Sequence, residues 1–178
     1  MNLHELRNDC AIKQKKGLHF ILASVLIWTA MLIINITSLP ILTKNLLTFF
    51  CTAPLMPIAF LISKIIKVDF QNKTNPLTNL GILFSLNQLL YLLIAMWIYQ
   101  AVPEKMLMVI AMIFGAHLLP FGWLYKSRTY KVFAIIIPIL ALIVGIYFEA
   151  YILAIMMVVI EVLFSISLMI ENKQIKNL

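Results

Sequence analysis

Charged side chains are scarce in this sequence: they make up 12% of its 178 residues, whereas 63% are hydrophobic, and the mean hydropathy is +1.00. A soluble domain of this size needs more polar surface to cover its core, so the composition excludes a soluble globular protein. Largely apolar runs of roughly seventeen residues or more recur along nearly the whole chain, and each can cross a hydrocarbon core of about 30 Å as a helix. We therefore expect an all-α, polytopic membrane helix bundle that forms one domain in the lipid bilayer.

The usual catalytic motifs are absent as well. There is no HExxH, no GxSxG, no Walker sequence and no pair of aspartates on one helix, so intramembrane proteolysis, lipid phosphate chemistry and ATP hydrolysis lack their usual residues. The two cysteines, Cys10 and Cys51, have no metal-ligand spacing and are expected at different depths, which predicts neither a disulfide nor a zinc site. We expect no enzymatic activity, no catalytic residue, no metal and no cofactor.

The net charge of +7 does not indicate a nucleic-acid partner, because the basic residues flank the apolar runs and form no separate basic face. The first apolar run, Leu18–Leu39, is longer than the core of a signal peptide and has no clear cleavage site at its end, so we interpret it as a retained span. The predicted division is an N-terminal cytoplasmic or interfacial segment, a six-helix transmembrane domain and a cytoplasmic tail, at residues 1–16, 17–171 and 172–178. The six spans are expected at about 17–39, 45–66, 80–100, 106–125, 132–148 and 150–170.

The distribution of cations predicts the orientation. An amino terminus in the cytoplasm places twelve of the fourteen Lys and Arg residues on the cytoplasmic side and leaves only Lys44 and Lys105 outside. The opposite orientation reverses that ratio and contradicts the positive-inside rule. We therefore expect both termini in the cytoplasm.

Four polar residues inside the predicted spans are the candidates for a substrate or ion pathway: Asn87 and Gln88 in the third span, His117 in the fourth, and Glu161 near the centre of the sixth. Such a group costs several kcal/mol in hydrocarbon unless it is paired or faces a cavity. Residue counts from the cytoplasmic ends of the spans place all four in one layer near the midplane, where His117 and Glu161 can share a proton.

A structural role is the alternative for each candidate. Asn87, Gln88 and His117 can be hydrogen-bonded residues that hold helices together. Glu161 can be a permanently protonated acid bonded to Ser165 or to a neighbouring helix.

Three prolines are expected to break or loosen helices: Pro54 and Pro57 in the second span, and Pro120 in the fourth. A proline frees the carbonyl four residues earlier, which offers an acceptor to a cation or a water molecule. The alternative is that these prolines only shape the bundle.

The second and fourth spans match at a shift of sixty-three residues, which superposes Ala53 on Ala116 and Pro57 on Pro120. Both spans would cross the membrane in the same direction, so the match indicates a parallel internal duplication of the kind that some transporters use. Shared composition is the alternative, because leucine-rich spans resemble one another.

The leading functional hypothesis is a small proton- or cation-coupled transporter or permease for an ion or solute that the sequence does not specify. Glu161 would carry the exchangeable charge, His117 would relay or sense it, and Asn87 and Gln88 would orient substrate or water. A homodimer is expected if there is a pathway, because six short spans enclose little volume.

The alternative hypothesis is a non-transporting membrane protein that binds or assembles a partner protein or lipid. Small residues at Ala111, Gly115 and Gly122 lie on one side of the fourth span, so that another helix can approach closely there. On this hypothesis they form the contact face.

Two stretches, NQLLYLLIAMWIYQAVPEKM at residues 87–106 and GAHLLPFGWLYKSRTYKVFA at 115–134, carry a family resemblance that extends over most of the chain, including SKIIKVD and the NPL before the third span. The chain resembles a functionally uncharacterised family of small six-span bacterial membrane proteins. The resemblance implies a bacterial plasma or inner membrane and supports the six-span layout. It supplies no catalytic residue.

The orientation is testable with tags and introduced cysteines. Tags at either terminus should report the cytoplasm, and a cysteine in place of Lys44 or Lys105 should react with an impermeant thiol reagent from outside the cell. Labelling at position 105 only from the inside would overturn this topology.

Overall fold

The computed structural model describes the backbone of residues 2–176 and the side chains of residues 2–174. It is 85% helical. In chain order the helices are α1 (Leu3–Lys13), the short 3₁₀ helix η1 (Lys15–Gly17), α2 (Leu18–Asn35), α3 (Ile41–Thr52), α4 (Leu55–Ile65), α5 (Leu77–Ala101), the short 3₁₀ helix η2 (Pro103–Lys105), α6 (Met106–Leu124), α7 (Arg128–Tyr147) and α8 (Ala150–Lys176).

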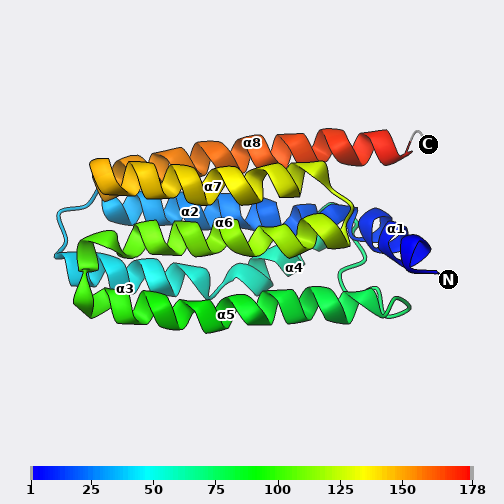
Figure 1. The fold of residues 1–178 in the computed structure, drawn as a ribbon, viewed down its shortest axis with the longest axis horizontal. Helices are drawn as coiled ribbons and strands as arrows, with labels where there is room; N and C mark the ends of the chain where they lie inside the picture. Colours follow the sequence, from blue (N-terminus) through cyan, green and yellow to red (C-terminus); the bar gives the residue numbers. More distant parts are fainter. Residues whose placement is uncertain (1, 177–178) are drawn as a thin grey trace.

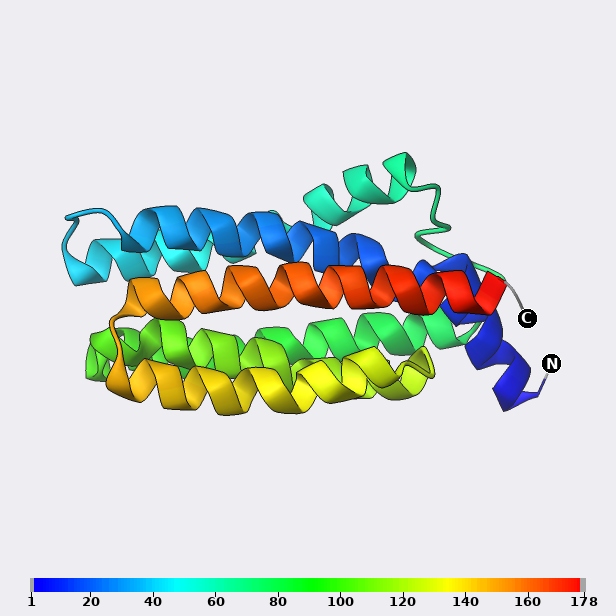
Figure 2. The same cartoon turned by 90° about the horizontal axis from the view of Figure 1, so that it is seen from above.

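The long helices run side by side along one axis and form an elongated bundle (Figure 1). Five of them, α2, α5, α6, α7 and α8, are long and apolar enough to cross a membrane, and the bent pair α3 and α4 adds a sixth if it counts as one span. The all-helical, membrane-type bundle expected from the sequence is confirmed. Helix α1 and the last turns of α8 lie at the same end of the bundle (Figures 1 and 2), which we call the α1 end.

The chain breaks at Pro54, between α3 and α4, with a bend of 42°. Proline has no amide hydrogen to donate and disfavours the helical conformation in the residue before it, so the α3 helix ends there. Pro57 falls in the first turn of α4, where backbone amides have no helical partner in any case. Figure 2 shows α4 turning away from the direction of the other helices.

Pro120 does not break its helix, contrary to the expectation. Helix α6 is continuous from Met106 to Leu124, and Pro120 lies inside it. Only about one turn follows Pro120, so the helix loses a hydrogen bond near its end without changing direction. The two spans that match at sixty-three residues therefore differ in shape, since one is broken at Pro54 and the other is a single continuous helix.

Helices α6 and α7 pack most closely, because glycines remove side chains from their interface. A Cβ atom on Gly115 would lie 2.6 Å from Cδ of Pro138 and 2.7 Å from Cγ2 of Ile137. On the facing helix, a Cβ atom on Gly145 would lie 2.6 Å from Cβ of Met108. The small-residue face of α6 is therefore covered by α7, and the expectation that it contacts another protein is wrong.

Helix α1 and Gln14, the residue after it, are held across the α1 end of the bundle by hydrogen bonds to the end of α6 and to the α6–α7 turn. Arg7 donates to the carbonyl of Trp123 at the end of α6, and its guanidinium carbon lies 4.4 Å from the centre of the Trp123 ring. Lys126 donates to Asn8 Oδ1 at 2.7 Å, and Tyr125 donates to Gln14 Oε1 at 2.9 Å. The predicted N-terminal segment is thus a helix that is bound to the bundle.

Asp9 connects α1 to the loop before α5. Its Oδ2 accepts hydrogen bonds from Asn72 at 3.0 Å and from Asn75 at 2.8 Å, and its Oδ1 lies 2.7 Å from Nζ of Lys13. Burial alone would raise the pKa of the Asp9 carboxyl, but the hydrogen bonds from Asn72, Lys13 and Asn75 outweigh that effect and lower the pKa to about 2. The carboxylate is therefore ionised at neutral pH.

The α6–α7 contact makes a specific prediction about stability. Gly115→Val should reduce the free energy of unfolding by about 1–3 kcal/mol, because the new side chain has to displace Pro138 or Ile137. Ala116→Val is the matched control, since Ala116 is the next residue and is exposed. Thermal unfolding of the purified protein in detergent measures both, and an equal loss of stability in the two variants would contradict the proposed packing.

Candidate functional site

The most deeply buried acid of the bundle, Glu161 of α8, contacts a serine of α2. Glu161 is fully buried, and its Oε2 forms a hydrogen bond with Oγ of Ser24. Ser24 Oγ also lies 2.7 Å from the carbonyl oxygen of Ile21. A hydroxyl has one hydrogen, so it cannot donate to both oxygens at once. If Glu161 is protonated, both contacts are satisfied: Glu161 donates to Ser24, and Ser24 donates to Ile21.

Two further polar atoms near this contact have no hydrogen-bond partner. They are Oε1 of Glu161 and Oγ of Ser165, one turn along α8, and both are buried. The Glu161–Ser165 hydrogen bond, which is one of the structural alternatives, is therefore not formed, and the bond to a neighbouring helix takes its place. Buried polar atoms without a protein partner are the usual positions of internal water molecules.

Ser24 also lines a cavity of about 90 Å³ in the middle of the bundle. The walls come from five helices, α2 to α6, and the polar side chains among them are Ser24, Thr52 and Gln88. Thr52 is the last residue of α3, so the bend at Pro54 forms part of the wall. The volume suits a few water molecules or a small ion, and it is well below the roughly 300 Å³ and more that pockets for larger organic ligands occupy.

His117 lies beside this cavity but is not bonded to Glu161. Its Nδ1 lies 2.5 Å from the carbonyl oxygen of Phe114, and its ring packs against the rings of Phe114 and Phe121. Phe114 lines the cavity, and Phe121 contacts Phe84 of α5, so this face of α6 points toward α5. The His117–Glu161 pair expected from the sequence is absent, because His117 bonds to its own helix and faces a different neighbour.

Asn87 lies on the outside of the bundle. Its side chain is exposed and donates to the hydroxyl of Tyr91 on the same helix at 3.0 Å. Gln88, the next residue, lines the cavity. The structure therefore brings Gln88 and Ser24 to one cavity, with His117 beside it, and it separates Asn87 from them.

Sequence reasoning missed three residues, Ser24, Thr52 and His19. Serine and threonine are too common in membrane helices to stand out, because they can bond to their own backbone. His19 was detectable, since it is a histidine at the start of the first apolar run. It is 1% exposed, both ring nitrogens lack a partner, and its ring lies 4.4 Å from that of Phe20 and 5.3 Å from that of Phe70.

The family comparison matches nearly the whole chain. A family model described as a family of unknown function, DUF7010, matches residues 3–171. The chain belongs to the DUF7010 family. No curated protein and no solved structure matches the chain. The family membership confirms that the chain resembles an uncharacterised family, and it brings no assigned chemistry to Glu161 or to any other residue of the site.

Proposed function

We propose that this DUF7010 protein is a small proton- or cation-coupled transporter of the plasma or inner membrane, without enzymatic activity, in which Glu161 carries the exchangeable proton. The observation that supports this role is the position of Ser24, whose hydroxyl touches Glu161 and which is also one of the residues that line the cavity. A carboxyl with a purely structural role does not need a hydrogen-bond partner that also lines a cavity. The unpartnered Oε1 of Glu161 leaves room for a second interaction on the same group.

Ser24 can pass a proton without changing its own charge. For this step the Ser24 hydrogen has to turn from the carbonyl of Ile21 to a water molecule in the cavity. Protonated Glu161 then donates its proton to Ser24 Oγ as Ser24 releases its own hydrogen to that water. The carboxylate that remains then binds a cation or takes up a new proton from the other side of the membrane. In this proposal Gln88, which lines the cavity, orients the water or the cation with its amide. His117 lies between the cavity and the α1 end, where it can sense or relay the charge.

Glu161→Gln tests the proposal, because the amide keeps the shape and a hydrogen bond but cannot ionise. We expect the variant to fold and to lose proton flux in liposomes that carry a pH gradient and a pH-sensitive dye. Ser24→Ala should reduce the flux, since it removes the connection to the cavity. Ser63→Ala is the matched control, because Ser63 is also buried but bonds only to the carbonyl of Phe60 in its own helix.

Thermal unfolding across about pH 5 to 9 separates a functional from a structural carboxyl. A carboxyl that exchanges protons in this range makes stability vary with pH, and Glu161→Gln should remove that variation. If the pH profiles of wild type and Glu161→Gln coincide, and no ion gradient drives flux in either, Glu161 is a structural acid and the transport proposal fails.

Helix α5 favours a second candidate function, the assembly of two copies of the chain. Of its residues, all of which the structure describes, only Ala95 is buried. Its outer face carries large apolar side chains together with Asn87, an amide that has a single hydrogen bond to Tyr91. An amide exposed to hydrocarbon is costly, and pairing of Asn87 with its counterpart in a second copy removes that cost.

Asn87→Leu should therefore weaken a dimer. The measurement is energy transfer between two differently labelled populations in liposomes, with Gln100→Leu as the control because Gln100 is an exposed amide at the far end of α5. We expect transfer in the wild type and in the control and a clear loss in Asn87→Leu. Equal energy transfer in all three proteins would show that the outer face of α5 around Asn87 is not the contact between two copies.

A further inference from the structure

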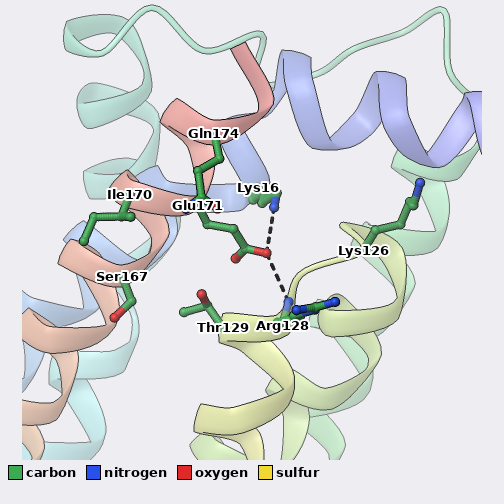
Figure 3. A pocket seen from close by; sticks show the side chains of 8 residues that line it. All are labelled: Lys16, Lys126, Arg128, Thr129, Ser167, Ile170, Glu171 and Gln174. Carbon is green, nitrogen blue, oxygen red and sulfur yellow. Dashed lines mark hydrogen bonds and ion pairs between the residues drawn. The ribbon is translucent and has the colours of Figure 1, made fainter. Parts of the chain in front are cut away.

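A second polar site lies at the α1 end, between the start of α7 and the end of α8. The structure has a pocket of about 470 Å³ there, open to the surface. Its lining includes three cations from three different segments, Lys16 of η1, Lys126 of the α6–α7 turn and Arg128 of α7, and one acid, Glu171 of α8 (Figure 3).

Glu171 fixes the walls of this pocket. Its Oε1 lies 2.9 Å from Nζ of Lys16 and accepts a hydrogen bond from the backbone nitrogen of Arg128 at 3.1 Å. Its Oε2 accepts a hydrogen bond from Ser127 at 2.6 Å. The Lys16 side chain is 3% exposed, so this cation is held inside the protein. The carboxylate thus joins η1, α7 and α8 before any ligand arrives.

The pocket keeps an excess of positive charge. Among the residues whose side chains are described, the ion pairs are Lys13 with Asp9 and Lys16 with Glu171. Neither pair includes Arg128 or Lys126. Lys126 points toward α1, where it contacts Asn8 and His4. Arg128 is exposed at the pocket, and its planar guanidinium can bind two phosphate oxygens at once.

The opposite wall of the pocket, on α8, includes one apolar side chain, Ile170. Ser167 and Ile170 of α8 line it, and the exposed neighbours Ile166 and Met169 continue the apolar surface beside it. A ligand that fits both walls therefore has an anionic head and a hydrocarbon tail. Free phosphate has no hydrocarbon tail, so it matches only the basic wall of the pocket.

We propose that this pocket binds the phosphate headgroup of an anionic lipid. The phosphate lies against the exposed guanidinium of Arg128, and the acyl chains run along Ile170. This site is separate from Glu161 and does not depend on the transport proposal.

The experiment measures lipid retained by the purified protein in detergent, by native mass spectrometry, together with the shift in thermal unfolding. The probes are phosphatidylglycerol, phosphatidylcholine and inorganic phosphate. Arg128→Gln should weaken phosphatidylglycerol retention about tenfold, because one charge-assisted, two-point contact is lost while the backbone bond to Glu171 remains. Ser167→Leu, which fills the pocket without changing charge, should weaken it as well.

Two control variants distinguish binding in this pocket from nonspecific attraction of anionic lipid to the basic residues of the protein. Lys173→Gln removes an exposed cation of α8 that does not line the pocket, and Glu161→Gln alters the central site; both should retain phosphatidylglycerol like the wild type. The unfolding temperature of each variant without lipid checks its fold. Three results would each overturn the lipid site. They are a loss of phosphatidylglycerol in Lys173→Gln equal to that in Arg128→Gln, retention of phosphatidylcholine equal to that of phosphatidylglycerol, and a thermal shift with inorganic phosphate alone equal to that with phosphatidylglycerol.

Discussion

A polar group in hydrocarbon has to find its partner inside the protein, and this constraint joins α2 to α8. Glu161, Ser24 and the carbonyl of Ile21 form one hydrogen-bonded chain across that interface. The chain is complete only when Glu161 holds a proton, because the Ser24 hydroxyl has a single hydrogen to give. The same three groups therefore hold two helices together and couple their contact to the protonation of one carboxyl.

The central cavity follows from a different constraint, the missing amide hydrogen of proline. The bend at Pro54 directs α4 away from the bundle axis, and the end of α3 at Thr52 becomes part of a wall. Close contact of α6 and α7 through Gly115 and Gly145 has the opposite effect, since it leaves no space between those helices. Open space in the bundle is thus found beside the bend and is absent at the glycine contact.

The sequence predicts the class of fold and the approximate positions of the spans, because length and hydropathy are local properties. It does not predict partners, since those depend on which way each helix is rotated. Asn87 and Gln88 are neighbours in the chain and were expected to act together, yet successive helical residues point about 100° apart, so one faces outward and the other lines the cavity. The bond from Glu161 to Ser24 spans 137 residues and has no sequence signature.

Helices α2 and α8 are fixed to each other at two levels, and this limits which parts of the bundle can move. Ser24 and Glu161 meet in the middle, and Lys16, just before α2, pairs with Glu171 ten residues further along α8, a distance of about 15 Å along a helix. Two separated contacts oppose both sliding and rotation of one helix against the other. On the proposed function, the opening and closing of the cavity therefore falls to its other walls, the bent pair α3–α4 and the peripheral α5, where few side chains are buried.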